Sequence, residues 1–350
     1  MRIYFGTNRD PDDPQRPSGF GTRFSRQGLT DLRFGWADFA AGQTRDYALY
    51  VAAEKLAVEP QRAAVGDLSA QVLGSREVFE QTRRELVERG CDCVIYIHGF
   101  DVTFADALRR TAELQAFYAG RPMVWCVFSW PSDGSLLPFK AYASDRDDAR
   151  ASGVALGRGL LKLADFLRAT SPADYCSGGL HVLAHSMGVY ALRWALQAIR
   201  TQTPSLRRLF DQILLFGADE DDDAFECDHK LALLPDLARR VSVYVNPGDL
   251  ALVTSELTKG NPDRLGAGGP RNARALPDKV SVIDVERIED FAQDPTGHQY
   301  YRLLQPVRGD ALAVFAGAPA GDIPGREYLP ERRAFGLLPA APPKRRRVKA

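Results

Sequence analysis

The sequence predicts an α/β fold: a doubly wound, mostly parallel sheet with helices on both faces. From about residue 92 onward, strand-like segments alternate with helix-like segments, which is the order that such a sheet requires. The strand-like segments are apolar at nearly every position, as expected of parallel strands that are buried on both faces. A sharp strand-to-helix junction near residue 186 is the third indication.

The elements before the parallel region come first. Met1–Gly6 is expected to be the first strand, and Leu29–Trp36 an antiparallel edge strand. Val72, Phe79 and Leu86 support a helix just before the first clear parallel strand.

Six parallel strands are then predicted, of which the sixth is expected to be the last. They are Val94–Ile97, Met123–Phe128, Leu180–Leu183, Gln212–Phe216, Val241–Val245 and Val280–Ile283. The helices between them begin with Thr103–Tyr118, where Thr103 and Asp106 form a capping box.

The next helix is long, and four leucines mark its apolar face. They are Leu156, Leu160, Leu163 and Leu167. Gly153 and Gly157 are expected to let this helix lie close on the sheet, and Val189–Arg200 forms the helix after the junction.

Residues 1–325 are expected to form one domain, in which 1–90 supply N-terminal edge strands and a helix and 91–325 the catalytic core. Residues 326–350 are predicted to be a disordered, Pro/Ala-rich basic tail. Its run Lys344–Lys349 superficially resembles a nuclear import signal or a nucleic-acid-binding arm, although a solvated tail is the favoured interpretation.

Bulk composition excludes several classes of protein. The 350 residues carry 45 acidic and 45 basic side chains, so net charge gives no attraction to nucleic acid. No apolar segment is long enough for a membrane span, and the first residues do not read as a secretory signal. Five cysteines, an odd number without metal-ligand spacing, are expected to be free thiols of a cytoplasmic protein. We expect no cofactor and no metal.

The junction itself reads Ala184-His185-Ser186-Met187-Gly188. A serine with small residues two positions before and after it, between a strand and a helix, is the nucleophile-elbow pattern. The turn lifts the serine hydroxyl clear of the sheet and directs a helix N-terminus at the attacked group. The pentapeptide alone is weak evidence, because a serine that caps a helix gives the same letters.

A serine nucleophile needs a base and an acid that orients it, in the chain order Ser, Asp or Glu, His. His298 is the only histidine beyond residue 249, and it follows the last predicted strand. Two aspartates follow the strands after the elbow: Asp219 after the first and Asp249 after the second. Asp249 is favoured, because Asp219 begins an acidic run that should be exposed to solvent; Asp219 stays the alternative.

An oxyanion hole needs two backbone N–H donors. Met187 is expected to supply one, at the start of the elbow helix. The other is expected from Phe100, because Ile97-His98-Gly99-Phe100 ends a central strand with a glycine that admits the substrate to the backbone.

Two further segments bear on the substrate pocket. The acidic run 219–223 is interpreted as a solvated loop and helix start rather than a cation site. Residues 259–279 are expected to be a mobile insertion whose Lys259, Arg264, Arg271 and Arg274 weakly favour an anionic or polar substrate group. The span 218–239 is too short for a folded cap domain, so the pocket should be open.

The chain resembles α/β hydrolases, and within them a branch of bacterial serine-hydrolase-like proteins whose function is largely unassigned. The matching segments are Tyr4–Arg9, Ile97–Phe100, Phe128–Ser132, Ala184–Gly188, Asp249–Leu252 and Gly297–Tyr300. They occur in the order that the branch shows and span nearly the whole chain. The resemblance implies the fold and the reaction class, and it also matches Asp249 rather than Asp219.

What the resemblance implies is acyl transfer to Ser186 followed by hydrolysis of a small-molecule ester or related acyl substrate, with His298 as base and an aspartate beside it. Two alternatives stay open at the level of sequence. One is an acyltransferase with the same three residues, and the other is a catalytically idle hydrolase fold that binds a partner.

Overall fold

The structure is a computed structural model. It describes residues 1–29, 31–53, 74–132, 138–168, 178–202, 208–253 and 263–339. Within these residues, eleven strands form one sheet in the order β12-β13-β11-β10-β9-β8-β6-β7-β1-β4-β5. The eight strands from β13 to β1 in this order are parallel to their neighbours, and β12, β4 and β5 are antiparallel.

The strands of this sheet are β1 (Arg2–Thr7), β4 (Arg33–Phe39), β5 (Tyr47–Val51), β6 (Asp92–Ile97), β7 (Met123–Ser129), β8 (Leu180–His185), β9 (Phe210–Phe216), β10 (Ala238–Val245), β11 (Val280–Asp284), β12 (Arg326–Leu329) and β13 (Ala334–Leu337). β2 (Arg9–Pro11) and β3 (Phe20–Phe24) form a separate hairpin. The helices are α2 (Gly74–Arg89), α3 (Phe104–Phe117), α4 (Pro138–Arg168), α5 (Met187–Gln202), α6 (Leu234–Leu237), α8 (Leu265–Gly268), α9 (Tyr300–Leu303) and α10 (Gln305–Phe315).

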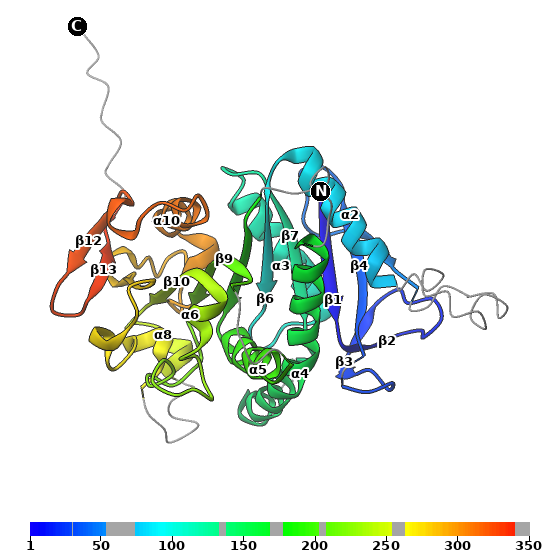
Figure 1. Ribbon diagram of the computed structural model, residues 1–350, viewed down its shortest axis with the longest axis horizontal. Helices are drawn as coiled ribbons and strands as arrows, with labels where there is room; N and C mark the ends of the chain where they lie inside the picture. Colours follow the sequence, from blue (N-terminus) through cyan, green and yellow to red (C-terminus); the bar gives the residue numbers. More distant parts are fainter. Residues whose placement is uncertain are drawn as a thin grey trace, which may run out of the picture.

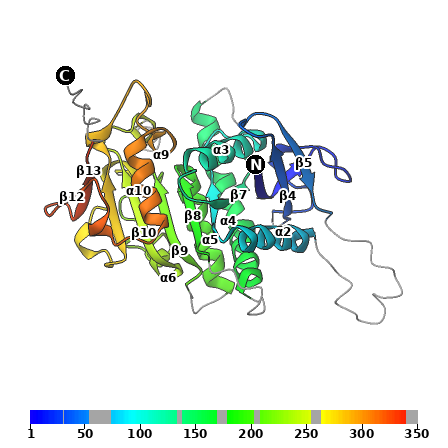
Figure 2. The same cartoon turned by 90° about the horizontal axis from the view of Figure 1, so that it is seen from above.

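Helices cover both faces of the sheet, as predicted (Figures 1 and 2). One buried apolar cluster joins a face of the sheet to α2, α4 and α5 and extends to α6 and α8. A second cluster joins the opposite face to α3, α9 and α10. Every residue of β6 and β8 is buried, because these central strands are covered from both sides. The doubly wound α/β prediction is therefore confirmed.

Local signals located the helices well. α3 begins after Thr103, whose side chain accepts a hydrogen bond from the Asp106 N–H, as the predicted cap requires. The helix expected before the first parallel strand is α2, with Phe79 and Leu86 buried; Val72 lies outside the described residues.

The two glycines of α4 contact a helix rather than the sheet, which corrects our expectation. A Cβ on Gly153 would lie 2.4 Å from the Cβ of Trp194, and one on Gly157 would lie 3.0 Å from the carbonyl oxygen of Ala195. Both partners belong to α5. The glycines therefore let α4 approach the elbow helix closely.

The predicted antiparallel edge strand is antiparallel but does not lie at the edge. It is β4, which starts at Arg33 and pairs with β1 on one side and β5 on the other. β5 forms the edge, and its residues alternate between half-buried and exposed. β5 is not among the predicted strands: its sequence, Tyr-Ala-Leu-Tyr-Val, is apolar at every position and does not show the alternation typical of an edge strand.

The chain also stays ordered beyond residue 325, contrary to the predicted tail. β12 and β13 form a hairpin, and β13 pairs in parallel with β11, so β11 is not the last strand. Arg326 anchors the hairpin through a buried ion pair with Asp310, and Leu337 is buried in the core. The basic run Lys344–Lys349 lies outside the described residues.

The insertion predicted to be mobile is folded in the part that the structure describes. Arg264 is buried and bonds to Asp221, and Gly266 lies so close to the Ala218 backbone that a Cβ would be 2.2 Å from its nitrogen. Arg271 pairs with Glu226. Two of the four cations, Arg264 and Arg271, are thus engaged within the fold, which weakens the argument for an anionic or polar substrate group. Arg274 is exposed, and Lys259 lies outside the described residues.

None of the described helices is long and apolar enough to cross a membrane. The described residues also contain no group of three or more His, Cys, Asp or Glu side chains that could hold a metal ion.

Candidate active site

The elbow at Ser186 has the strained geometry that its sequence predicts. Ser186 lies between β8 and α5 with φ of 54°, a left-handed conformation that non-glycine residues rarely adopt. A Cβ on Gly188 would lie 2.4 Å from the Ile97 carbonyl oxygen, so only glycine fits there. Ala184 is fully buried. The side chain of Ser186 is therefore held at the carboxyl end of the central strands.

The second glycine of the site belongs to the segment after β6. A Cβ on Gly99 would lie 2.9 Å from the Cβ of Ser186, so this glycine lets the Ile97–Phe100 segment pass directly beside the serine. Within the described part of the chain, no acceptor forms a hydrogen bond with the Phe100 N–H. Met187 is the first residue of α5, where an N–H has no partner inside the helix.

His298 and Asp249 lie together, although 49 residues separate them in sequence. The His298 Nδ1 is 2.5 Å from Asp249 Oδ2. The other carboxylate oxygen, Oδ1, accepts the N–H groups of Ala251 and Leu252, which fixes its orientation. Burial raises the pKa of the Asp249 carboxyl, and the hydrogen bond from His298 acts in the opposite direction.

The loop that carries His298 is fixed by a contact between Gly297 and Asn246. Gly297 has φ of 64°, and a Cβ there would lie 2.8 Å from Asn246 Nδ2. The same Asn246 amide donates to the Gly297 carbonyl oxygen at 2.7 Å. Asn246 precedes Asp249 in the turn after β10, so one segment places both Asp249 and the loop that carries His298.

Gly217, at the end of β9, joins this pair to the elbow. A Cβ on Gly217 would lie 3.0 Å from the His298 ring and 3.4 Å from Asp249 Oδ2. On the elbow side, Ser186 N–H donates to the Phe216 carbonyl oxygen at 2.9 Å. The end of β9 thus contacts both Ser186 and the Asp249–His298 pair. Among the described residues, however, the Ser186 hydroxyl and the His298 ring form no hydrogen bond. Such contacts often tighten only when substrate binds.

Asp219, the alternative acid, is not paired with His298. It is 2% exposed rather than solvated, and its carboxylate accepts a hydrogen bond from the Tyr142 hydroxyl. Arg146 and Arg264 lie 3.9 and 3.7 Å from its oxygens. The expectation of an exposed residue is wrong because the cations that stabilise it come from distant parts of the chain.

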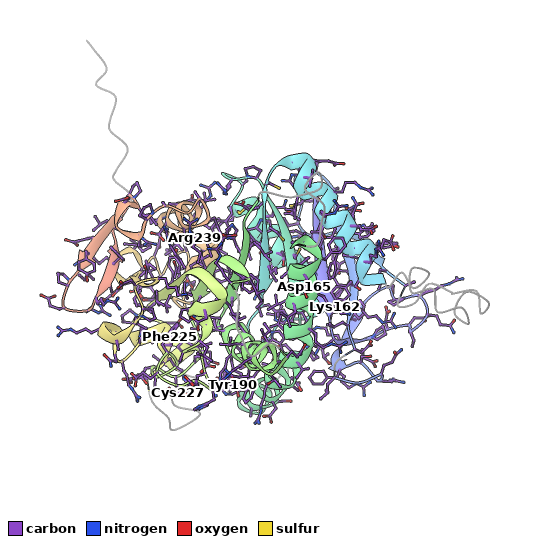
Figure 3. All side chains as sticks on the ribbon, in the orientation of Figure 1. Lys162, Asp165, Tyr190, Phe225, Cys227 and Arg239 are labelled. Carbon is purple, nitrogen blue, oxygen red and sulfur yellow. The ribbon has the colours of Figure 1, made fainter. Side chains whose placement is uncertain are left out.

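The rest of the acidic run is also engaged. Glu220 is fully buried and pairs with Arg193, and Asp221 pairs with Arg264 and Lys230. Arg146 stacks over Tyr190. Tyr190, which is labelled in Figure 3, lies one turn after Ser186 on α5. The run is therefore part of a buried ionic cluster behind the elbow, not a solvated loop.

Two other histidines lie near the site without meeting the geometry of a base. His185 stacks on Tyr301, and its Nε2 donates to the His298 carbonyl oxygen at 3.0 Å. His98 stacks on Trp130. Burial lowers the pKa of both imidazoles well below the usual value; the neighbouring His298 also contributes at His185, and Arg9 at His98.

These shifts predict a loss of stability in mild acid. Below pH about 6.5, the unfolded chain binds protons on His98 and His185 that the folded protein does not bind. The free energy of unfolding should therefore fall as the pH falls, by up to about 1.4 kcal/mol per pH unit for each histidine. Denaturant unfolding between pH 7.5 and 5.5 measures this slope.

The slope of wild type alone is not sufficient, because the raised pKa of Asp249 makes the free energy of unfolding rise as the pH falls, opposite to the two histidines. Since Asp249 contributes equally to wild type and to a histidine variant, the difference between their slopes isolates the histidine. His185→Gln, whose amide can keep the bond to the His298 carbonyl oxygen, should roughly halve the slope. Substitution of the exposed His229 by Gln is the control and should leave it unchanged. Equal slopes for wild type and His185→Gln would contradict the prediction.

Two tyrosines complete the site, and sequence reasoning assigned them no role. The Tyr300 hydroxyl accepts the Gly217 N–H at 2.7 Å and donates to the Tyr244 carbonyl oxygen at 3.1 Å. It thereby fixes the strand end on which the Asp–His pair packs. Tyr142 approaches from α4, with its ring 5.8 Å from that of Phe100. Tyr300 lies in a segment that the resemblance matched, whereas nothing in the sequence marked Tyr142.

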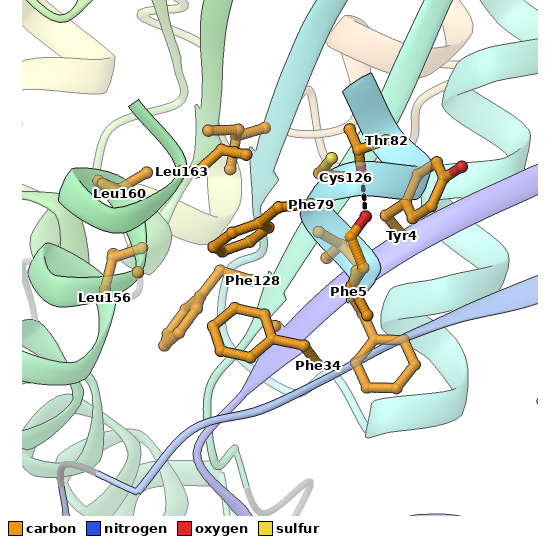
Figure 4. A pocket seen from close by; sticks show the side chains of 15 residues that line it. Tyr4, Phe5, Phe34, Phe79, Thr82, Cys126, Phe128, Leu156, Leu160 and Leu163 are labelled. Atoms are coloured by element: carbon orange, nitrogen blue, oxygen red, sulfur yellow. Dashed lines mark hydrogen bonds between the residues drawn. The ribbon is translucent and has the colours of Figure 1, made fainter. Parts of the chain in front are cut away.

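An apolar cavity of about 50 Å³ lies elsewhere, between the sheet and helices α2 and α4 (Figure 4). Phe79, Phe128 and Leu160 are among its lining residues, and none of Ser186, Asp249 and His298 is. Its lining is almost entirely apolar, and the hydroxyls of Tyr4 and Thr82 are hydrogen-bonded to Glu85 and to the Val78 carbonyl oxygen.

Residues 77–312 match a family model described as "Alpha/beta hydrolase of unknown function (DUF900)". The match covers most of the chain, from α2 to α10. The chain belongs to this family. Membership establishes the α/β-hydrolase fold and, in general terms, a hydrolase-type activity, and it agrees with the resemblance in leaving the substrate open. No curated protein and no solved structure matches the chain.

Proposed function

We propose that this DUF900 protein is a serine hydrolase that cleaves carboxylic esters through an acyl-enzyme on Ser186. The observation that carries the proposal is the contact of Asp249 with His298 at the end of β9, beside the strained serine. A binding protein has no need for a left-handed serine and a buried Asp–His pair at the same strand ends.

The pair is suited to general-base catalysis. Because the Asp249 carboxylate accepts the Nδ1–H of His298, the lone pair of the imidazole is on Nε2. In the proposed reaction, Ser186 Oγ attacks the carbonyl carbon of the ester and its proton passes to Nε2. Asp249 stabilises the imidazolium that forms.

The negative charge that develops on the carbonyl oxygen is assigned to two backbone donors. Met187 N–H, at the start of α5, and Phe100 N–H, beside Gly99, are not used within the described fold. Such donors stabilise the tetrahedral intermediate more than the ground-state ester. The C–O bond then breaks, His298 protonates the leaving alcohol, and a water molecule hydrolyses the acyl-enzyme by the same steps.

An open substrate pocket predicts a preference for short acyl chains. Between β9 and β10 the structure has only the four-residue helix α6, so no cap domain folds over this side. Para-nitrophenyl esters of two to four carbons should be hydrolysed faster than those of twelve to sixteen. Emulsified long-chain lipid should give no activation at the oil–water interface.

The measurement is a panel of acyl chain lengths, with Ser186→Ala as the blank. Hydrolysis that rises with chain length or shows interfacial activation would contradict the open site. Turnover that the blank retains would contradict the serine mechanism itself.

A further inference from the structure

The segment 98–102, here called the oxyanion loop, connects β6 to α3 and carries the Phe100 N–H. Asp101 in this loop has φ of 56° and an exposed side chain. A left-handed aspartate is unfavourable, so the surrounding structure must impose this conformation. Buried side chains from three other segments do so.

Arg9 holds the C-terminal end of the loop. Its side chain is fully buried, and its Nη2 donates to the Val102 carbonyl oxygen at 2.7 Å. Its Nε donates to Ser129 Oγ at 2.9 Å, and its Nη1 to the Gly21 carbonyl oxygen at 3.1 Å. The rigid guanidinium thus links the β2–β3 hairpin and the end of β7 to the loop.

Ser132 and Asp145 accept the backbone N–H groups of Val102 and Asp101 at the C-terminal end of the loop. Ser132 Oγ accepts the Val102 N–H at 3.3 Å and donates to Asp145 Oδ2. That carboxylate oxygen also accepts the Asp101 N–H, at 3.5 Å. Both side chains are fully buried, and Asp145 comes from α4, so a helix that packs on the elbow helix also fixes the loop.

Trp130 holds the N-terminal end. Its Nε1 donates to the His98 carbonyl oxygen at 2.9 Å, and its ring stacks on that of His98. Backbone groups on both sides of Phe100 are therefore occupied by buried side chains, while the Phe100 N–H itself has no acceptor among the described residues. This distribution leaves one donor of the loop free and beside Ser186.

We propose that Arg9, Ser132 and Asp145 are positioning residues that set the Phe100 N–H for the oxyanion. The inference rests on the proposed function and adds the residues that make its oxyanion hole rigid. It also gives a task to two matched segments of the sequence, Tyr4–Arg9 and Phe128–Ser132, that the catalytic assignment left unused.

The expected signature is a fall in kcat without a matching rise in KM, because the oxyanion forms only in the transition state. Asp145→Ala frees the Asp101 N–H and the Ser132 hydroxyl and should lower kcat on para-nitrophenyl acetate about 10- to 100-fold. KM should change less than about threefold. Asp145→Asn keeps an acceptor oxygen in place and should retain most of the rate. Ser132→Ala, a smaller change, should give about a tenfold loss.

A matched control comes from the opposite end of the sheet. Asp92 is a buried carboxylate at the start of β6 that also accepts a backbone N–H, from Gly179 at 2.7 Å, and a side-chain bond from Arg121. Asp92→Ala should lower the unfolding temperature as Asp145→Ala does, yet keep kcat within about twofold of wild type. This separates positioning from general loss of stability.

Three outcomes would overturn the inference. They are a kcat for Asp145→Ala that equals that of Asp92→Ala, a loss expressed in KM rather than kcat, and no rescue by Asp145→Asn. If Asp145→Ala does not fold, Ser132→Ala decides by the same criteria. Wild-type turnover in Ser186→Ala would instead refute the proposed function, and the role of the loop with it.

Discussion

Asp249→Asn is expected to lower kcat on para-nitrophenyl acetate by about 10⁴-fold while the protein stays folded. The carboxylate accepts Nδ1–H from His298, which leaves the imidazole lone pair on Nε2, the atom proposed to take the Ser186 proton. A neutral amide can donate to Nδ1 instead, which favours the wrong tautomer, and it no longer stabilises the imidazolium. The measurement is steady-state kinetics, with circular dichroism to verify the fold.

Asp219→Asn is the matched comparison, since both carboxylates are buried and follow neighbouring strands. It should mainly lower stability, by about 3 kcal/mol in urea unfolding, because Arg146 and Arg264 lose a compensating charge. Its kcat should stay well above that of Asp249→Asn. A near-wild-type rate for Asp249→Asn together with a collapse for Asp219→Asn would exchange the two roles.

The arrangement of the candidate site was largely predictable because parallel strands impose it. The carboxyl ends of such strands meet at one edge of the sheet, so residues that follow β8, β10 and β11 must lie near one another. Ser186, Asp249 and His298 each follow one of these strands. Gly188 and Gly99 then mark positions where the neighbouring atoms leave no room for a side chain, and Ala184 is fully buried.

The ionic cluster behind the elbow was not predictable, because its partners are distant in sequence. An acidic run such as 219–223 looks solvated when it is considered alone. In the fold, Arg146 and Arg193 from the facing helices and Arg264 from the segment after β10 surround it. Local composition does not contain this information, since the cluster is created by the packing of α4 on α5 and by the fold of the segment after β10.

The strands at the two edges of the sheet were not predicted, for a related reason. β5, β12 and β13 are only four or five residues long, and the sequence of β5 is apolar throughout instead of alternating as its half-buried and exposed positions do. β13 is stabilised by pairing with β11, and the hairpin by the Arg326–Asp310 pair, both of which are tertiary contacts. The Pro/Ala-rich residues that follow β13 suggested a disordered tail, so the predicted end of the domain, residue 325, lies before this hairpin.

Labelling of Ser186 by a fluorophosphonate tests the central claim most directly. A serine activated by His298 attacks the phosphorus and expels fluoride, which leaves a covalent adduct that mass spectrometry of the digested protein locates. Wild type should carry one adduct, on the peptide that contains Ser186, and Ser186→Ala should carry none. Asp249→Asn should react far more slowly than wild type. Equal labelling of wild type and Ser186→Ala, or an adduct on another residue, would contradict the account.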